Sequence, residues 1–363
     1  MEIKELSIQE KVGQMMVIGM TTNEITPRIE EMITKYKIGG IILYRKNFKT
    51  YQEMLALIQQ LKELNKRNKI PLWIAIDQEG GRVNRMPKEI LNLPAANKIA
   101  KMGGLEEVEK AATIIGEILK KSGYGMNFAP VLDIKRFEDN HAIGDRCYGE
   151  TKEEAEKYGI SVMKRLQEGG VMPVIKHFPG HGATKQDSHF SLPILKEKME
   201  FLEKEDMEPF AKAIQEGADA ILVGHLLVKN VTRIYPASLS RTLIGKYLRK
   251  KYRYNGLVIT DDLKMKVVHF LYGAELAVKK AIEAGNDMIV FCFNAKEEKK
   301  VIEKMTHYVE TGKIKEARIN RSIKRIIKMK EKYRISDESK IEGVDIDKIN
   351  REIKRIRNLC QLN

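Results

Sequence analysis

Eight short apolar runs, spread along the whole chain, limit its fold more than any other feature of the sequence. Each run is nearly continuous in aliphatic residues, as a strand buried on both faces of a parallel sheet requires. The runs are residues 12–20, 38–44, 71–77, 126–134, 171–178, 220–228, 256–262 and 287–293. They predict eight strands of a parallel sheet.

Amphipathic segments with helical spacing separate these runs, and several of them end in Gly, a residue favoured just beyond helix C-termini. The clearest are residues 105–123, 152–170, 207–219 and 273–287. Since no Gly/Pro-rich linker or internal repeat interrupts the alternation, it predicts a (β/α)₈ barrel rather than an open doubly wound sheet. We expect residues 1–335 to form the barrel and residues 336–363 a helical extension packed on it.

The composition fits a globular protein of a reducing compartment. Of the 363 residues, 43% are hydrophobic and 32% are charged, which is too much apolar material for a disordered chain. No apolar stretch approaches the length of a membrane-spanning helix, and the N-terminus lacks the pattern of a secretory signal. Cys147, Cys292 and Cys360 lie far apart, without CxxC spacing. We therefore expect a cytoplasmic protein without a disulfide framework.

The net charge of +15 is concentrated near the C-terminus, in residues 315–334 and 351–358. Isoleucines recur there at helical spacing, which favours basic outer faces of packed helices over a nucleic-acid-binding helix. We expect a monomer that binds neither nucleic acid nor a membrane.

Ionisable residues stand at the ends of five of the predicted strands. In a (β/α)₈ barrel the C-terminal ends of the strands carry the active site. Any one of these residues alone could be a helix cap or a satisfied polar group, but their common position predicts a shared catalytic pocket. They are Asp77, Asp133, Lys176 with His177, His225, and Asp261 with Asp262.

The stretch KHFPGHGATKQDSH, residues 176–189, offers two kinds of site. His177 and His181 have the spacing of a helical zinc motif, but Pro179 and Gly180 forbid the helix, so we expect no metal. In an extended loop, residues two apart face the same way. Asp187 and His189 could therefore form an acid/base pair, although an ordinary turn is the default for an isolated DSH tripeptide.

Two further motifs supply carboxylates and donors. In GLVITDDLKM we assign the reactive role to Asp261, nearer the strand end, and a capping or supporting role to Asp262. In IDQEGGRVNR, Asp77 can accept hydrogen bonds from paired sugar hydroxyls, and Arg82 and Arg85 can donate. The latter motif lacks the pattern of a phosphate loop, so we expect no nucleotide or other cofactor.

Together these motifs resemble glycoside hydrolase family 3, and within it the bacterial β-N-acetylglucosaminidases of peptidoglycan turnover and recycling. The resemblance covers nearly the whole chain. It rests on EKVGQM (10–15), GGIILYRKN (39–47), IDQEGGRVNR (76–85), MNFAPVLDI (126–134), IGDRCYGE (143–150), KHFPGHG with DSH, and TDDLKM (260–265).

The resemblance implies a retaining exo-β-N-acetylglucosaminidase that acts on muropeptides or disaccharides derived from peptidoglycan. Asp261 resembles the nucleophile of the family, His189 the acid/base and Asp187 its partner. The residues that resemble those holding the terminal N-acetylglucosamine are Asp77, Arg85, Arg146, Lys176 and His177.

Two departures from the family pattern concern substrate fit. Cys147 and Tyr148 stand where the family usually reads GDRSFG, and residues 266–268 lack the Gly that often follows DDLxM. A phosphorylase or broad β-glucosidase on the same fold, and an inactive basic protein that binds cell-wall fragments or nucleic acid, remain as alternatives.

Overall fold

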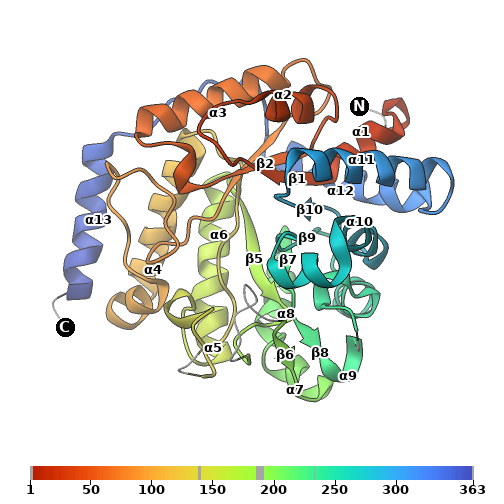
Figure 1. Ribbon diagram of the computed structural model, residues 1–363. Coiled ribbons are helices and arrows are strands. Elements are labelled where there is room, and N and C mark those ends of the chain that lie inside the picture. The colour runs from red at the N-terminus through yellow and green to blue at the C-terminus, as the bar shows by residue number, and fades with distance from the viewer. Residues whose placement is uncertain (1–2, 138–139, 185–191, 233, 362–363) are drawn as a thin grey trace.

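The computed structural model describes residues 3–137, 140–184, 192–232 and 234–361. Within these residues, eight parallel strands form one sheet in the order β10-β1-β2-β3-β4-β5-β7-β9. A parallel bridge between Ile259 and Met288 joins the two outer members, so the sheet closes into a barrel with helices around it (Figure 1). The predicted (β/α)₈ fold is confirmed. The strands are β1 (Met16–Gly19), β2 (Gly40–Leu43), β3 (Trp73–Ile76), β4 (Met126–Asn127), β5 (Met172–Phe178), β7 (Ala220–Val223), β9 (Leu257–Thr260) and β10 (Ile289–Val290).

Each strand lies inside one of the eight predicted apolar runs, and every strand residue is buried. The runs are longer than the strands because they also include residues of the segments just before and after them. A small parallel pair, β6 (Ile194–Leu195) with β8 (Leu227–Val228), lies outside the barrel and was not predicted.

The helices that surround the barrel differ from the prediction mainly at their N-terminal ends. Two predicted helices, 105–123 and 273–287, belong to longer helices, α4 (Ala96–Lys121) and α10 (Lys266–Ala284). Each is interrupted by a glycine with positive φ, Gly104 at 64° and Gly273 at 68°. A glycine takes this conformation without the steric cost that a side chain brings, so the helical segments meet there at a kink. The sequence pattern marked only the part after the kink.

The helices are α1 (Ile8–Gln14), α2 (Pro27–Thr34), α3 (Tyr51–Asn65), α4 (Ala96–Lys121), α5 (Lys152–Glu154), α6 (Ile160–Glu168), α7 (Met199–Lys204), α8 (Glu208–Gln215), α9 (Lys229–Thr232), α10 (Lys266–Ala284), α11 (Ala295–Glu310), α12 (Glu316–Lys332) and α13 (Ile346–Gln361). Wider π-type turns occur at Ala155–Gly159 and Thr242–Lys251. None of the described helices is long and apolar enough to cross a membrane.

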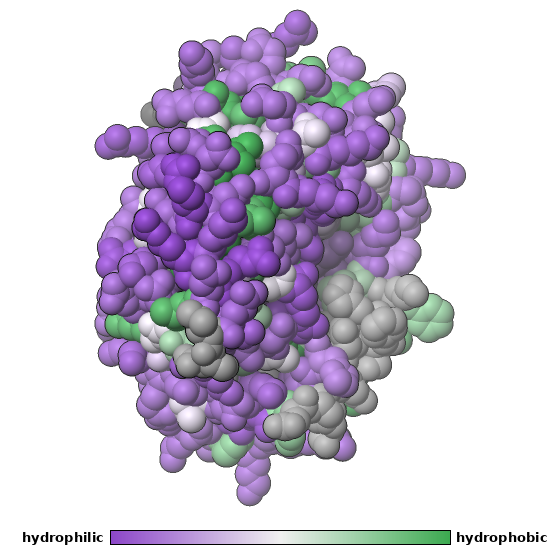
Figure 2. Space-filling view, turned by 90° about the vertical axis from the view of Figure 1, so that its left-hand side faces the viewer, coloured by the Kyte–Doolittle hydropathy of each residue, from purple (hydrophilic) through white to green (hydrophobic). Residues whose placement is uncertain are grey.

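The C-terminal helix α13 packs against α4 at the side of the barrel (Figure 1). Its buried side chains, Ile349, Ile353, Ile356 and Cys360, recur every three or four residues and so form one stripe. Basic residues of α13 are exposed on the outside, and the face of the molecule seen from this side is largely hydrophilic (Figure 2). The basic C-terminal segments therefore present their charge on the outer faces of packed helices.

A buried lysine at the end of α12 ties together three segments at the N-terminal side of the barrel. The ammonium of Lys330 donates to Gln14 Oε1 at 2.9 Å, to the Gly39 carbonyl at 3.0 Å and to the Pro71 carbonyl at 2.6 Å. Only 2% of Lys330 is exposed. These bonds hold the chain just before β2 and β3 to the outer helix layer.

We expect Lys330→Met to lower the free energy of unfolding by roughly 2–4 kcal/mol, because buried acceptors lose their donor. Urea denaturation followed by circular dichroism measures this. Lys328→Met, on an exposed position of the same helix, is the matched control and should change stability by less than about 0.5 kcal/mol. Equal stability of the two variants would show that the Lys330 hydrogen bonds contribute little.

Candidate active site

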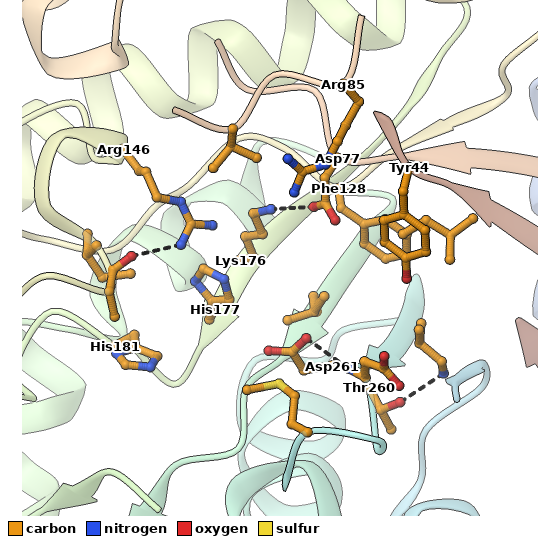
Figure 3. A pocket seen from close by; sticks show the side chains of 18 of the residues that line it. Tyr44, Asp77, Arg85, Phe128, Arg146, Lys176, His177, His181, Thr260 and Asp261 are labelled. Atoms are coloured by element: carbon orange, nitrogen blue, oxygen red, sulfur yellow. Dashed lines mark hydrogen bonds and ion pairs between the residues drawn. The ribbon is translucent and has the colours of Figure 1, made fainter. Parts of the chain in front are cut away.

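A cavity of about 800 Å³ opens at the C-terminal ends of the barrel strands. Side chains from several strands and the loops after them face it (Figure 3). Those from the strand ends include Tyr44, Asp77, Phe128, Lys176, His177 and Asp261, and those from the longer loops include Arg85, Arg146 and His181. The structure thus brings together six predicted site residues: Asp77, Arg85, Arg146, Lys176, His177 and Asp261.

The two neighbouring carboxylates after β9 have different surroundings. Asp262 Oδ1 accepts backbone hydrogen bonds from Lys264 and Cys292, both at 3.0 Å, so this side chain holds the turn after the strand. Asp261 Oδ1 accepts one backbone hydrogen bond, from Asp262 at 2.8 Å, and the carboxylate faces the cavity beside Lys176 and His177 (Figure 3). Both residues line the cavity, but Asp261 accepts fewer backbone hydrogen bonds and is therefore the one freer to contact a bound molecule.

The pKa values of the two carboxyls are shifted in opposite directions. Burial acts to raise the pKa of Asp261, but attraction from His225 and His177, the backbone hydrogen bond and Lys176 together lower it below its usual value. Burial dominates at Asp262 and raises its pKa. Asp261 is accordingly ionised at neutral pH, as a carboxylate nucleophile must be.

A buried glutamate that sequence reasoning missed organises the cationic side of the cavity. Glu79 Oε1 lies 2.5 Å from the Lys176 ammonium, and both Glu79 oxygens accept from Arg146, at 2.8 and 2.9 Å. Lys176 also donates to Asp77 Oδ1 at 2.8 Å. Burial acts to raise the pKa of Glu79, but the charges of Lys176 and Arg146 hold it well below its usual range.

The network places Lys176 and Arg146 side by side in spite of their like charge, because Glu79 is shared between them. The sequence did contain an indication of this role. Two cations predicted in one pocket, Lys176 and Arg146, need a buried counter-charge, and Glu79 lies two residues after the predicted site residue Asp77. The spacing alone does not predict which loop supplies this counter-charge.

We expect Glu79→Gln to lower the free energy of unfolding by about 3 kcal/mol at neutral pH, because two buried cations lose their shared counter-charge. The folded-state pKa of Glu79 is lowered, so its contribution is complete above the unfolded value near pH 4.3 and is lost as the pH falls below it. The stability difference between the wild type and the variant should therefore shrink below about pH 4.

Denaturation at a series of pH values measures the effect, and the exposed pair of Arg82 Nε with Asp145, 2.9 Å apart, supplies the control. Each of its side chains is 44% exposed, so Asp145→Asn should cost less than about 1 kcal/mol. A Glu79→Gln loss as small as that of Asp145→Asn would contradict the assignment of Glu79 as the shared counter-charge.

Asp133, predicted at the end of the fourth strand, lies beneath the cavity and fixes the two histidines of KHFPGHG. One of its oxygens lies 2.6 Å from His177 Nδ1, and the other accepts from the His181 backbone amide at 2.6 Å. His181 Nδ1 lies 2.8 Å from the Thr184 hydroxyl. Burial lowers the pKa of His181 to about 4, and so its imidazole is neutral at pH 7.

His225 also supports the site without facing the cavity. Its Nδ1 lies 2.7 Å from the Ser238 hydroxyl, and its Nε2 lies 3.0 Å from the Asp262 carbonyl. Of the five predicted strand-end groups, Asp133 and His225 hold neighbouring segments, whereas Asp77, Lys176 with His177, and Asp261 with Asp262 line the cavity.

The two arginines after β3 have different roles. Arg82 donates to the carbonyls of Ala142 and Ile143, both at 2.9 Å, and so ties its own loop to the loop that carries Arg146. Arg85 faces the cavity, and its buried Nε has no hydrogen-bond partner among the described residues. A molecule in the cavity could accept from this guanidinium.

The predicted acid/base pair, Asp187 and His189, lies outside the described residues. The chain that leads to it does line the cavity, through His181, and the hydrogen bonds of Thr184 to His181 hold that approach.

A barrel with an ionised carboxylate at a strand end, beside several hydrogen-bond donors, is suited to bind and cleave a polyhydroxylated substrate. Comparison with known proteins agrees. Residues 7–329 match the model of the "Glycosyl hydrolase family 3 N terminal domain". The chain belongs to glycosyl hydrolase family 3, whose members cleave glycosidic bonds, and is a glycoside hydrolase.

Three relatives illustrate the similarity. A "Beta-hexosaminidase" of Xylella fastidiosa (strain M23) is 31% identical over 284 residues, which cover 77% of this chain and 83% of that protein. One of Hydrogenovibrio crunogenus is 28% identical, over 86% of this chain and 89% of that protein. The structure of a family 3 β-N-acetylglucosaminidase from Paenibacillus sp. str. FPU-7 superposes with a TM-score of 0.92 at 33% identity, covering 98% of this chain and 69% of that one.

Proposed function

We propose that this protein is a retaining exo-β-N-acetylglucosaminidase that removes terminal N-acetylglucosamine from peptidoglycan-derived muropeptides or disaccharides in the cytoplasm. The observation that carries the proposal is the ionised Asp261 carboxylate, presented to a cavity rich in hydrogen-bond donors. The similarity to proteins named β-hexosaminidase and β-N-acetylglucosaminidase supports the sugar class.

In the proposed reaction, Asp261 attacks the anomeric carbon and forms a covalent glycosyl-enzyme while His189 protonates the departing oxygen. His189 then removes a proton from the water that releases the sugar, so two inversions give net retention of configuration. Asp187 is proposed to hold the His189 ring in the tautomer and orientation that this exchange needs.

The cavity also offers a basis for holding the terminal sugar. The hydrogen bond from Lys176 leaves the second oxygen of Asp77 available to accept from a hydroxyl, and the Arg85 guanidinium can donate. Arg146 is oriented by Glu79, and His177 by Asp133. Because their partners fix these side chains before a sugar arrives, binding costs little side-chain entropy.

Release of p-nitrophenol from the N-acetyl-β-glucosaminide and from the β-glucoside tests the proposal. We expect kcat/KM to favour the N-acetyl substrate by at least about 100-fold, since lost polar contacts to the N-acetyl group cost several kcal/mol. A preference for the glucoside would indicate a β-glucosidase, and no turnover of either would indicate an inactive binding protein.

Phosphorolysis is the second candidate, because Lys176, Arg146 and Arg85 bring positive charge to the cavity and a neutral histidine would leave room for an anionic acceptor. The same assay with and without phosphate distinguishes the two reactions. We expect the rate to be independent of phosphate and the product to be free N-acetylglucosamine. Formation of the sugar 1-phosphate would replace hydrolysis by phosphorolysis.

We also expect activity to be independent of metal. Nδ1 of His177 contacts the Asp133 carboxylate, and Nδ1 of His181 contacts the Thr184 hydroxyl. The described residues contain no group of three or more His, Cys, Asp or Glu arranged to hold an ion. Exhaustive dialysis against a chelator should leave kcat/KM unchanged within error. A loss that added zinc restores would revive the zinc interpretation of the two histidines.

A further inference from the structure

A second cavity, of about 210 Å³, lies at the opposite end of the barrel from Asp261. Its floor is made by Leu72 and Gly125, which immediately precede β3 and β4, and by Tyr124. The C-terminal turns of α3 and α4 form its walls together with the segment that connects α12 to α13. The N-terminal ends of the strands separate it from the catalytic end, so a ligand here would not share the active site.

The cavity is strongly cationic. Five basic side chains line it, against the one carboxylate of Glu342: Lys62, Lys120, Lys121, Arg334 and Lys340. Two of them have nearby acceptors, since Lys121 pairs with Glu117 at 2.9 Å and Lys120 donates to the Gly170 carbonyl at 3.2 Å.

Among these five basic residues, Lys62 gives the strongest evidence for a bound anion. It is only 6% exposed, and its ammonium makes no hydrogen bond or ion pair with any described residue. Asp337 attracts it from a distance, but the Asp337 carboxylate is engaged by the Asn65 side chain at 2.6 Å and the Leu72 amide at 3.2 Å. A nearly buried ammonium that faces a cavity without a partner is costly unless an anion binds there.

The pKa values report the same repulsion. Burial lowers the pKa of Lys62, where Lys120 adds to the effect, and burial lowers the pKa of Lys120, where Arg334 adds to it. These cations come from three separate segments of the chain, and the fold holds them close together although their like charges repel. An anion between them would relieve that repulsion.

Tyr124 and two serines also belong to the lining. The Tyr124 hydroxyl has no hydrogen-bond partner among the described residues, but it is buried and does not reach the open space. Ser336 and Ser339 lie in the segment that follows α12, and their hydroxyls can donate to an anion in the cavity.

Complementation of helix dipoles explains only part of this arrangement. Lys62 and Lys120 lie in the last turns of α3 and α4, where basic residues offset the partial negative charge of the helix end. A lysine does this from an exposed position. The role does not require the burial of Lys62 or the contribution of Arg334 from another segment.

We propose that this cavity is a binding site for a small phosphate-bearing anion, either free phosphate or a phosphomonoester. A cavity of 210 Å³ has the volume of roughly seven waters, at about 30 Å³ each, so it accommodates a phosphoryl group with a few additional atoms but not a polymer. Lys62 and Lys120 are the residues on which binding depends most, and bound anion stabilises the folded protein by mass action.

Isothermal titration with inorganic phosphate and with glycerol 3-phosphate tests the proposal. Both are run in the presence of saturating N-acetylglucosamine and at ionic strength matched with sodium chloride, so that the active site is occupied and general screening is controlled. We expect one site per chain in the wild type. The ligand with the lower Kd, inorganic phosphate or glycerol 3-phosphate, shows whether the cavity prefers the free anion or its ester.

Lys62→Met should weaken binding by at least about tenfold, and Lys120→Met by several-fold to tenfold, because each removes a donor to a charged acceptor. Lys66→Met is the control, since Lys66 lies one turn away on the same helix end and pairs with Glu63 and Glu338. It should bind as the wild type does. Lys120 is exposed, so Lys120→Met decides the test if Lys62→Met does not fold.

Binding no stronger than that of chloride in the wild type, or binding that survives unchanged in both Lys62→Met and Lys120→Met, would overturn the proposal. Neither result bears on the hydrolase activity, which is measured at the other end of the barrel.

Discussion

Asp261→Asn is expected to reduce turnover by about four orders of magnitude or more while leaving the fold and sugar binding intact. An amide cannot form the covalent glycosyl-enzyme, and removal of a nucleophile costs this much in enzymes that work through such intermediates. The folded state should tolerate the change, because an amide oxygen can still accept the Asp262 backbone hydrogen bond. Steady-state kinetics on an aryl N-acetyl-β-glucosaminide, with calorimetric titration of N-acetylglucosamine, measures both effects.

Asp262→Asn is the matched control. The Asp262 side chain accepts from the backbone of Lys264 and Cys292, and the amide oxygen of Asn can replace the carboxylate in both bonds. Burial raises the pKa of its carboxyl, opposite to the shift at Asp261. We expect at most about a tenfold effect. An inactive Asp262→Asn beside a fully active Asp261→Asn would reverse the assignment of the nucleophile.

The second large effect concerns His189. If His189 is the acid/base, His189→Ala should lower kcat on a natural disaccharide by several orders of magnitude, because the alkoxide leaves poorly without a proton. An activated aryl group needs little protonation, so the first step on that substrate should remain fast and the glycosyl-enzyme should accumulate. Burst kinetics on the aryl substrate and steady-state kinetics on the disaccharide separate the two steps.

Azide provides the rescue experiment, because this small anion attacks the glycosyl-enzyme without needing a general base. It should restore turnover of the aryl substrate by His189→Ala and yield a glycosyl azide of retained configuration. Asp187→Ala should show a milder form of the same pattern, since the imidazole remains but its tautomer is no longer fixed. Equal losses on both substrates without azide rescue would mean that the acid/base lies elsewhere in the chain.

The barrel was predictable because burial on both faces of a parallel strand leaves a strong and local trace in the sequence. The runs that contain Trp73–Ile76 and Leu257–Thr260 are nearly free of polar residues, and a polar residue marks the end of each strand. In a (β/α)₈ barrel, the C-terminal ends of all the strands lie on the same face of the barrel. This geometry is why Asp77, Lys176 and Asp261, far apart in sequence, could be assigned to one pocket from the sequence alone.

The partners inside the pocket were not predictable in the same way. Glu79 is shared by Lys176 and Arg146, and Asp133 holds both His177 and His181, but these contacts join different loops whose approach depends on the whole fold. The kink at Gly104 is hidden for a related reason. A glycine inside an amphipathic pattern gives no sign of whether its φ is negative or positive until the packing around it is known.

The covalent intermediate is the centre of the proposed mechanism, and trapping it tests that mechanism most directly. A 5-fluoro analogue of N-acetylglucosaminyl fluoride combines a good leaving group with a destabilised oxocarbenium-like transition state, so the second step becomes slow enough for the intermediate to accumulate. Mass spectrometry of the labelled protein, followed by peptide mapping, should find one sugar per chain, attached through an ester to Asp261. A label on Asp262 or another residue would contradict the mechanism. An unlabelled protein that hydrolyses an unmodified β-N-acetylglucosaminide and releases the α-anomer of N-acetylglucosamine first would contradict it as well.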